Sequence, residues 1–234
     1  MLQKLTREYV KKVIFEAFKD VQKGNGRGAR ECIADDDYAS VEDQKKAAAL
    51  DVEQHWWEYP KDLIERGDLD YSLTYNNYDG VKFHIPALMT AEIDGYGNTA
   101  GISVFGTLCE PYTTIHQYHR EYVAYIKSID ISRIIKQYNF NAEQVHAIAL
   151  YLLFDMHANN FRTQFFSNRE EIIERAKKDV ERPHNVKDYN LTLEDTMAIV
   201  DEKHRIVRDW FKVGEVDVDD YVYEENPEDT VSKN

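Results

Sequence analysis

Three aspartates in a row, Asp35–Asp37, are the residues of this chain with the clearest capacity for chemistry. Carboxylates bind hard cations through several oxygens, and a metal held in this way can activate water. Asp51 and His55 are four residues apart, so on a helix they would lie on one face. One hypothesis is therefore a metal-assisted hydrolase. Its site would use Asp36, Asp37, Asp51 and His55, or His84.

The same aspartates also have a structural interpretation. Neighbouring residues of a helix point about 100° apart, so at most two of the three can join one site. Aspartate side chains compete for backbone groups, which is typical of helix ends. We therefore expect Asp36 and Asp37 to end a helix, and we expect His84 to lie on a strand as a surface or packing residue.

The HQYH segment places His116 and His119 three residues apart, where they could share a helix face. A zinc-protease helix needs two histidines four apart with a glutamate between them, and that glutamate is missing. A third ligand could be Cys109, Glu110 or Glu121, but the sequence selects none of them. We predict no metal and no cofactor, with His116 and His119 as the alternative metal ligands.

Common catalytic signatures are missing from the sequence. It contains no GxxxxGK[ST] phosphate loop, no GxSxG elbow and no CxxC pair. The glycines of GNGRGA, residues 24–29, follow a predicted helix rather than a strand, so they indicate a turn. Whether the protein is an enzyme stays open, and these observations favour a protein without catalytic activity.

The charge of the chain is strongly acidic. Its 234 residues include 43 Asp and Glu against 29 Lys and Arg, a formal net charge of −14. Such a field repels phosphate backbones, so nucleic acid is an unlikely partner and a basic protein is a suitable one. Residues 214–234 hold eight acids and one lysine, and we expect them to form an acidic flexible tail.

The sequence also predicts the compartment. No stretch approaches the roughly 20 apolar residues that a membrane span needs, and charges interrupt the apolar residues of MLQKLTREYVKKVIFEAF. The two cysteines, Cys32 and Cys109, have no pairing pattern that indicates a disulfide framework. We expect a cytoplasmic protein with no membrane contact.

Apolar periodicity and capping residues predict a predominantly α-helical α+β fold. We expect one domain over residues 1–213 with a small antiparallel β-hairpin over about 70–88, where NNYDG would form the turn. A strand within residues 95–114 is a further expectation. The adjacent Trp56 and Trp57 should diverge, with one in the core. Two of the predicted helices cover residues 5–22 and 29–36. The others begin at Ser40, Pro60, Asn141, Ser167 and Thr192.

Four segments resemble an uncharacterised bacterial family known as domain of unknown function 6714. They are FEAFKDV (15–21), ECIADDDYAS (31–40), LDVEQHWWEYP (50–60) and DGVKFHIPALM (79–89). NAEQVHAIALYLLF is similar to a later helix of the family, whereas residues 95–135 and the tail depart from its shorter pattern. The family has no established activity, so the resemblance implies no catalytic residue. The positions that match its motifs are Asp36, Asp37, Tyr38, Asp51, Trp56, Trp57, Asp79, Gly80 and Pro86.

Two functions remain after these observations. The first is a non-enzymatic protein-binding or regulatory protein, comparable to an inhibitor or immunity protein, whose acidic surface engages a basic partner. The alternative is the metal-assisted hydrolase with clustered aspartates and histidines.

Overall fold

The computed structural model describes residues 2–96, 104–109, 120–158 and 192–224. This part of the chain is predominantly helical, as the sequence predicts. The first helices are α1 (Arg7–Phe18), α2 (Ala29–Asp36), α3 (Val41–Ala48), α4 (Lys61–Glu65), α5 (Tyr71–Thr74) and α6 (Tyr78–Ile93). The later ones are α7 (Val104–Cys109), α8 (Arg120–Lys127), α9 (Ile131–Gln137), α10 (Ala142–Ala158) and α13 (Leu193–Val213). The remaining elements are the 3-10 turns η1 (Trp56–Glu58), η2 (Asp68–Asp70) and η3 (Val218–Asp220), and strands β1 (Gln3–Leu5) and β2 (Tyr221–Tyr223).

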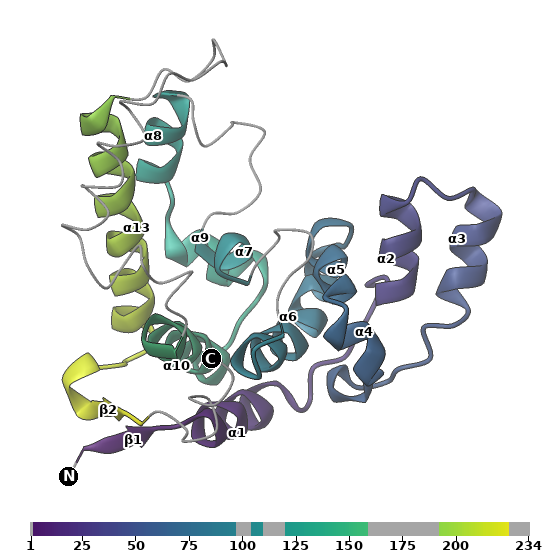
Figure 1. Ribbon diagram of the computed structural model, residues 1–234, viewed down its shortest axis with the longest axis horizontal. Helices are drawn as coiled ribbons and strands as arrows, with labels where there is room; N and C mark the ends of the chain where they lie inside the picture. The colour runs from purple at the N-terminus through teal and green to yellow at the C-terminus, as the bar shows by residue number, and fades with distance from the viewer. Residues whose placement is uncertain (1, 97–103, 110–119, 159–191, 225–234) are drawn as a thin grey trace, which may run out of the picture.

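Helix α10 lies near the centre of the molecule. It packs against α1 and α13, and α1 also packs against α6 (Figure 1). Its side chains are buried almost all round, from Val145 to Phe154, as the apolar sequence predicts. Helices α2 and α3 form one end of the molecule, and α8 and α13 lie at the other (Figure 1).

Capping residues set several helix starts. The Ser40 hydroxyl accepts a hydrogen bond from the Asp43 amide, and the Asn141 side chain accepts one from the Gln144 amide at 2.8 Å. Thr192 opens α13 with a reciprocal capping box. These starts confirm the predictions, and α2 has the predicted bounds. The predicted start at Ser167 lies outside the described residues.

The predicted hairpin over residues 70–88 is wrong, because this segment forms α5 and most of α6. Asn77 does not make a hairpin turn: its side chain accepts a hydrogen bond from the Gly80 amide and begins α6. Most side chains of α6 are buried, including Pro86, so no polar face reveals the helical period. His84 is therefore a fully buried helix residue and not a strand residue.

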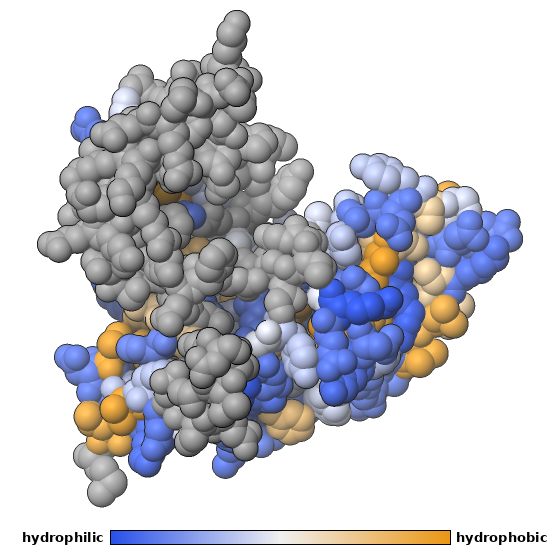
Figure 2. All heavy atoms as spheres, in the orientation of Figure 1, coloured by the Kyte–Doolittle hydropathy of each residue, from blue (hydrophilic) through white to orange (hydrophobic). Residues whose placement is uncertain are grey.

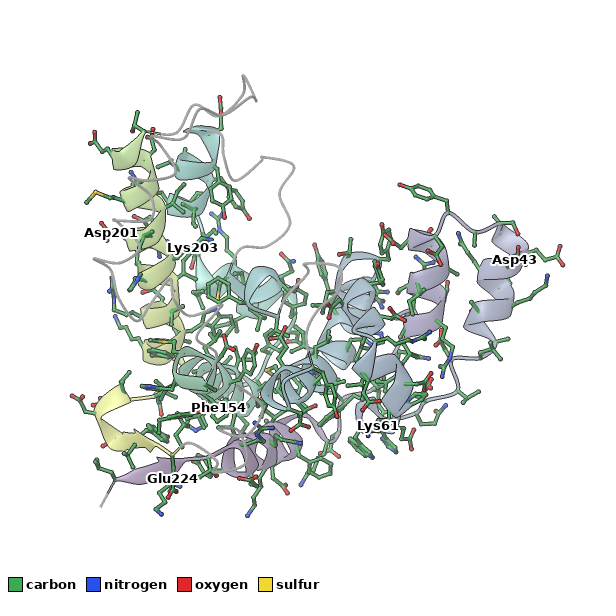
Figure 3. The ribbon with its side chains drawn as sticks, viewed as in Figure 1. Asp43, Lys61, Phe154, Asp201, Lys203 and Glu224 are labelled. Carbon is green, nitrogen blue, oxygen red and sulfur yellow. The ribbon has the colours of Figure 1, made fainter. Side chains whose placement is uncertain are left out.

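A two-stranded parallel sheet joins the two ends of the described chain. Gln3 pairs with Tyr221 and Leu5 pairs with Tyr223. The tail expected over 214–234 therefore contains η3 and the strand β2, and residues 225–234 lie outside the described part. The Tyr223 ring contacts Phe154 on α10, with ring centroids 5.7 Å apart; Figure 3 labels Phe154.

Two other expectations fail within the described residues. The segment expected to hold a strand within 95–114 forms α7 over Val104–Cys109, and its remaining residues from 97 are not described. The helix that begins at Ser40 is predicted to run through KKAAALDVEQHWW, but α3 ends at Ala48. No helix in the described ranges has the length and apolar character needed to cross a membrane.

The sheet predicts unequal effects for two leucines of the N-terminal segment. Leu5 is fully buried beneath the strand pair and Leu2 is exposed. We expect Leu5→Ala to lower the free energy of unfolding by about 3 kcal/mol, because it leaves a cavity. Leu2→Ala should change it by less than about 0.5 kcal/mol. Urea unfolding of both variants measures the difference, and equal effects would contradict the buried strand.

Candidate functional site

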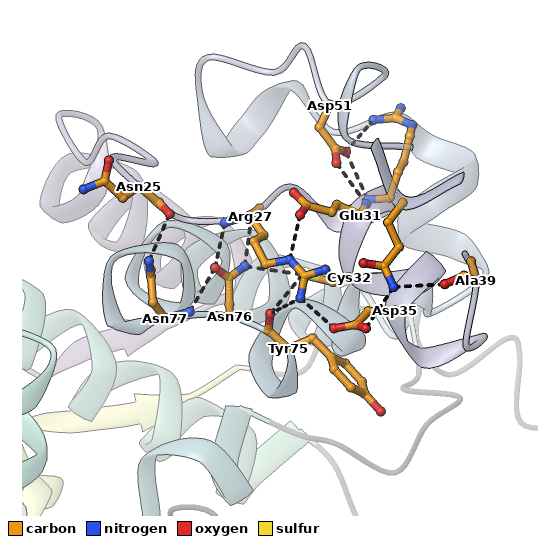
Figure 4. Close-up of polar contacts among 12 residues, drawn as sticks. Asn25, Arg27, Glu31, Cys32, Asp35, Ala39, Asp51, Tyr75, Asn76 and Asn77 are labelled. Carbon is orange, nitrogen blue, oxygen red and sulfur yellow. Dashed lines mark hydrogen bonds and ion pairs between the residues drawn. The ribbon is translucent and has the colours of Figure 1, made fainter. Parts of the chain in front are cut away.

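The candidate catalytic aspartates lie around the segment that joins α1 to α2. Arg27 is at the centre of this region, which we call the Arg27 cluster: Arg27, Glu31, Asp35, Asp51, Asn76 and His84 (Figure 4 shows all but His84). GNGRGA forms the turn that the sequence predicts, and it passes beside the start of α6, where Asn77 bonds the Asn25 carbonyl.

Asn76 holds the backbone of Arg27 from both sides. Its side-chain oxygen accepts the Arg27 amide at 2.8 Å, and its side-chain nitrogen donates to the Arg27 carbonyl at 2.8 Å (Figure 4). One amide side chain thus satisfies both backbone groups of a loop residue, which would otherwise cost free energy on burial. This bond pair ties the loop to the start of α6.

His84 reaches the same carbonyl from within α6. Its Nε2 lies 2.9 Å from the Arg27 oxygen, and its Nδ1 lies 2.8 Å from the Tyr59 hydroxyl. A carbonyl can only accept, so Nε2 carries the proton and Nδ1 accepts from Tyr59. Burial lowers the pKa of His84 to about 4, which keeps the ring neutral. Burial also raises the pKa of Tyr59, which keeps its proton on the hydroxyl.

The Arg27 side chain pairs with the acidic face of α2. Its Nε donates to Glu31 at 2.9 Å, and its Nη1 donates to Asp35 at 2.7 Å and to the Tyr75 carbonyl at 3.1 Å. Partial burial opposes the charge of Arg27, but the hydrogen bonds that Arg27 donates to Asp35 and Glu31 outweigh this effect and raise the pKa of Arg27. The first aspartate of the triplet is therefore a partner of arginine.

Asp51 caps the start of α2. Its two carboxylate oxygens accept the amides of Arg30 and Glu31, each at 3.0 Å, and Arg30 Nη1 lies 3.2 Å away (Figure 4). The side chain is only 2% exposed. Gly28 permits this approach, because a Cβ at that position would clash with the carboxylate. Asp51 follows α3 and lies outside any helix, so it does not share a helix face with His55.

The other two aspartates of the triplet have different surroundings. Asp36 accepts a hydrogen bond from the Tyr75 hydroxyl at 2.7 Å, and this bond raises the pKa of Tyr75 to about 12. Asp37 is exposed at the end of α2, as expected for a helix-ending residue. Tyr38 follows with a left-handed backbone, φ 53°, and is almost fully exposed.

The two tryptophans diverge as predicted. Trp56 is buried, and its indole nitrogen donates to the Phe18 carbonyl at 3.1 Å. Trp57 is partly exposed and stacks on the His55 ring, with centroids 4.4 Å apart. Asp36 and Asp51, the candidate metal ligands, are hydrogen-bonded to Tyr75 and to backbone amides instead.

The remaining positions that match the family motifs lie in α6. Asp79 is in its first turn, and the Gly80 amide donates a hydrogen bond to the side-chain oxygen of Asn77. Pro86 lies inside the helix and is buried. Sequence reasoning missed Arg27 and Asn76, since NNYDG looked like a hairpin turn.

Among the described residues, no three His, Cys, Asp or Glu side chains converge as a metal site requires. Asp36, Asp37, Asp51, His55 and His84 have the separate environments given above. His116 and His119 lie outside the described residues. Cys32 is buried beside Asn76, and burial raises the pKa of its thiol to about 12, so it is a poor nucleophile.

The comparisons with known proteins give one match. Residues 6–175 match the model of a family described as "Family of unknown function (DUF6714)". The chain belongs to this family. No curated protein and no solved structure matches the sequence. The matched range contains the whole Arg27 cluster, and it ends before α13 and β2.

The Asp51 cap predicts the cost of removing one acceptor. We expect Asp51→Asn to lower the free energy of unfolding by about 2 kcal/mol, because an amide nitrogen would then face a backbone N–H. Asp37→Asn, at the exposed end of α2, is the matched control and should stay within about 0.5 kcal/mol of the parent. Urea unfolding measures both, and a neutral Asp51→Asn would argue against the cap.

The buried His84 predicts a pH dependence. Its folded pKa of about 4 is below the unfolded value of about 6.5, so the unfolded chain binds the extra proton. The neutral His84 ring makes its full contribution to the free energy of unfolding above pH 6.5. That free energy falls by up to about 3 kcal/mol as the pH drops to 4. His84→Gln, which does not titrate, should flatten this part of the profile. Urea unfolding at several pH values tests it, and parallel profiles would contradict the neutral histidine.

Proposed function

We propose that the protein is a non-enzymatic binding protein of the bacterial cytoplasm that regulates a basic protein partner, as inhibitors or immunity proteins do. The docking surface would be the α3 face, which we define as Tyr38, Val41, Glu42, Asp43, Leu50 and Val52. Two free buried cysteines fit a reducing compartment.

The packing of α3 supports this proposal. No side chain of the helix is fully buried. Only Gln44, Ala47 and Ala48 are half-buried, and α2 is its main neighbour. Gln44 donates to Asp35 at 3.2 Å and to the Ala39 carbonyl at 3.1 Å, so two hydrogen bonds hold the helix against α2. Most of the surface of α3 therefore stays open to a partner.

Large apolar side chains are exposed to solvent at both ends of α3. Tyr38, Val41, Leu50 and Val52 are 62 to 94% exposed. Figure 2 shows apolar surface in orange among charged residues at this end of the molecule. Exposed apolar groups within a polar rim are typical of protein interaction sites. This exposure is the observation that carries the proposal.

The charge of the same region favours a basic partner. Residues 29–58 contain nine acids and three bases, a net charge of −6. Asp43 projects from the outer side of α3 (Figure 3), and Lys46 pairs with both Asp43 and Glu42, which leaves this pair net negative. Complementary charge gives specificity and faster association.

The candidate catalytic residues support a role without chemistry. Asp36 and Asp51 accept structural hydrogen bonds and His84 is neutral and buried, so none of these three is presented to a substrate. No observation on the described residues favours the metal-assisted hydrolase over this role.

Capture experiments test the proposed face. We expect the tagged protein to retain a basic partner from an extract of its own organism, and the double substitution Leu50→Ser and Val52→Ser to weaken retention about tenfold. Retention should also fall between about 0.05 and 0.5 M salt. Quantitative mass spectrometry of the eluted proteins measures both effects.

A second double substitution, at exposed apolar residues away from α3, controls for the general effect of losing exposed apolar side chains. Val218 and Val222 are also exposed, in η3 and β2. Val218→Ser with Val222→Ser should leave retention unchanged. Equal loss in both double variants, or a partner that is indifferent to salt, would argue against the α3 face.

A further inference from the structure

A groove of about 780 Å³ lies between α1, the start of α10 and the turn after α13. It is separate from the α3 face, since it shares no lining residue with it. Half-buried Val13 and Ala17 of α1, with Ala142, give it an apolar floor. The His146 ring lines one side, and its Nδ1 donates to the Gly214 carbonyl at 2.7 Å, which fixes α10 to the turn.

The charged rim of the groove is net negative. Four acids and two lysines line it: Glu16, Asp20, Glu143, Glu215, Lys12 and Lys19. Glu16 and Lys19 bond each other at 2.7 Å, so this pair is neutral. Among the described residues, the carboxylates of Asp20, Glu143 and Glu215 have no hydrogen bond or ion pair, which leaves three unpaired acids against Lys12.

Glu215 occupies a position that normally favours glycine. Its φ is 53°, in the left-handed region. The Val216 amide donates a hydrogen bond to the Phe211 carbonyl at 2.9 Å, which closes the turn. The adjacent Gly214 has an ordinary φ of −79°, and it is needed for packing, because a Cβ there would lie 2.6 Å from the Ala149 Cβ. A glutamate that lines the groove therefore has a backbone conformation that is unfavourable for it.

We infer that the groove binds a lysine side chain of a polypeptide partner. The aliphatic stem of lysine suits the floor of Val13 and Ala17, and its ammonium group suits the unpaired carboxylates of Glu143 and Glu215. The groove is open rather than enclosed, so a side chain can enter while the main chain of the partner remains outside. Charge and shape both favour this occupant.

The test uses a short fluorescent peptide that alternates lysine and serine, and measures its binding by anisotropy. Glu215→Gly should weaken binding about fivefold, although it should raise the melting temperature by about 2 °C through relief of the left-handed backbone. A purely structural Glu215 would give the stability gain alone. Glu143→Gln should also weaken binding, and Lys12→Gln should tighten it about twofold.

Two controls separate the groove from the general acidity of the chain. Asp62→Asn removes one negative charge from an exposed position of α4, outside both the groove and the α3 face, and should change peptide binding less than twofold. A free diamine should compete poorly, because it lacks the polypeptide. The inference is overturned if Asp62→Asn acts as strongly as the groove variants, if Glu215→Gly binds normally, or if the diamine competes as well as the peptide.

Discussion

The buried carboxylate of Asp51 is the interaction on which the α2–α3 end of the molecule depends. A charge taken out of water is costly unless hydrogen bonds and opposite charge compensate it. Asp51 receives two backbone amides at the start of α2, where the helix dipole also favours a negative group, and Arg30 supplies the countercharge. Because Asp51 follows α3, the same bonds close the two helices into one unit.

A second set of bonds joins this unit to the core. Asn76 and His84 both donate to the Arg27 carbonyl, so the loop before α2 is fixed to the central helix α6. Glu53 adds an ion pair with Arg30 at 2.8 Å. The acids of this region thus fall into two groups. The inner ones pair with arginine, with backbone amides or with the Tyr75 hydroxyl, whereas Asp37, Glu42 and Asp43 face solvent and give the surface its charge.

Local sequence signals predicted those features whose cause is local. Ser40, Asn141 and Thr192 cap helices by bonds to residues three positions away, and the bounds of α2 follow from such signals. The assignment of Asp36 and Asp37 to a helix end also needed only neighbouring residues. Burial on all sides hid α6, because a helix without a polar face has no visible period.

Long-range partners account for the rest of the differences. Asn76 and Arg27 are 49 positions apart, and the strands β1 and β2 pair residues near opposite ends of the chain. No pattern within a short stretch of the sequence indicates either the Asn76–Arg27 bonds or the strand pairing. The asparagine looked like a turn residue because turns and caps use the same side-chain chemistry.

The range of the family match separates the two surfaces. Residues 6–175 include α2, α3, Asp51, Asn76 and His84, so the support of the α3 face lies wholly inside the family segment. The groove has a floor from α1 and α10 within that segment, but Gly214 and Glu215 lie beyond it. The proposed α3 face thus lies wholly within the segment that matches the family model, whereas the proposed lysine site also needs two residues from outside that segment.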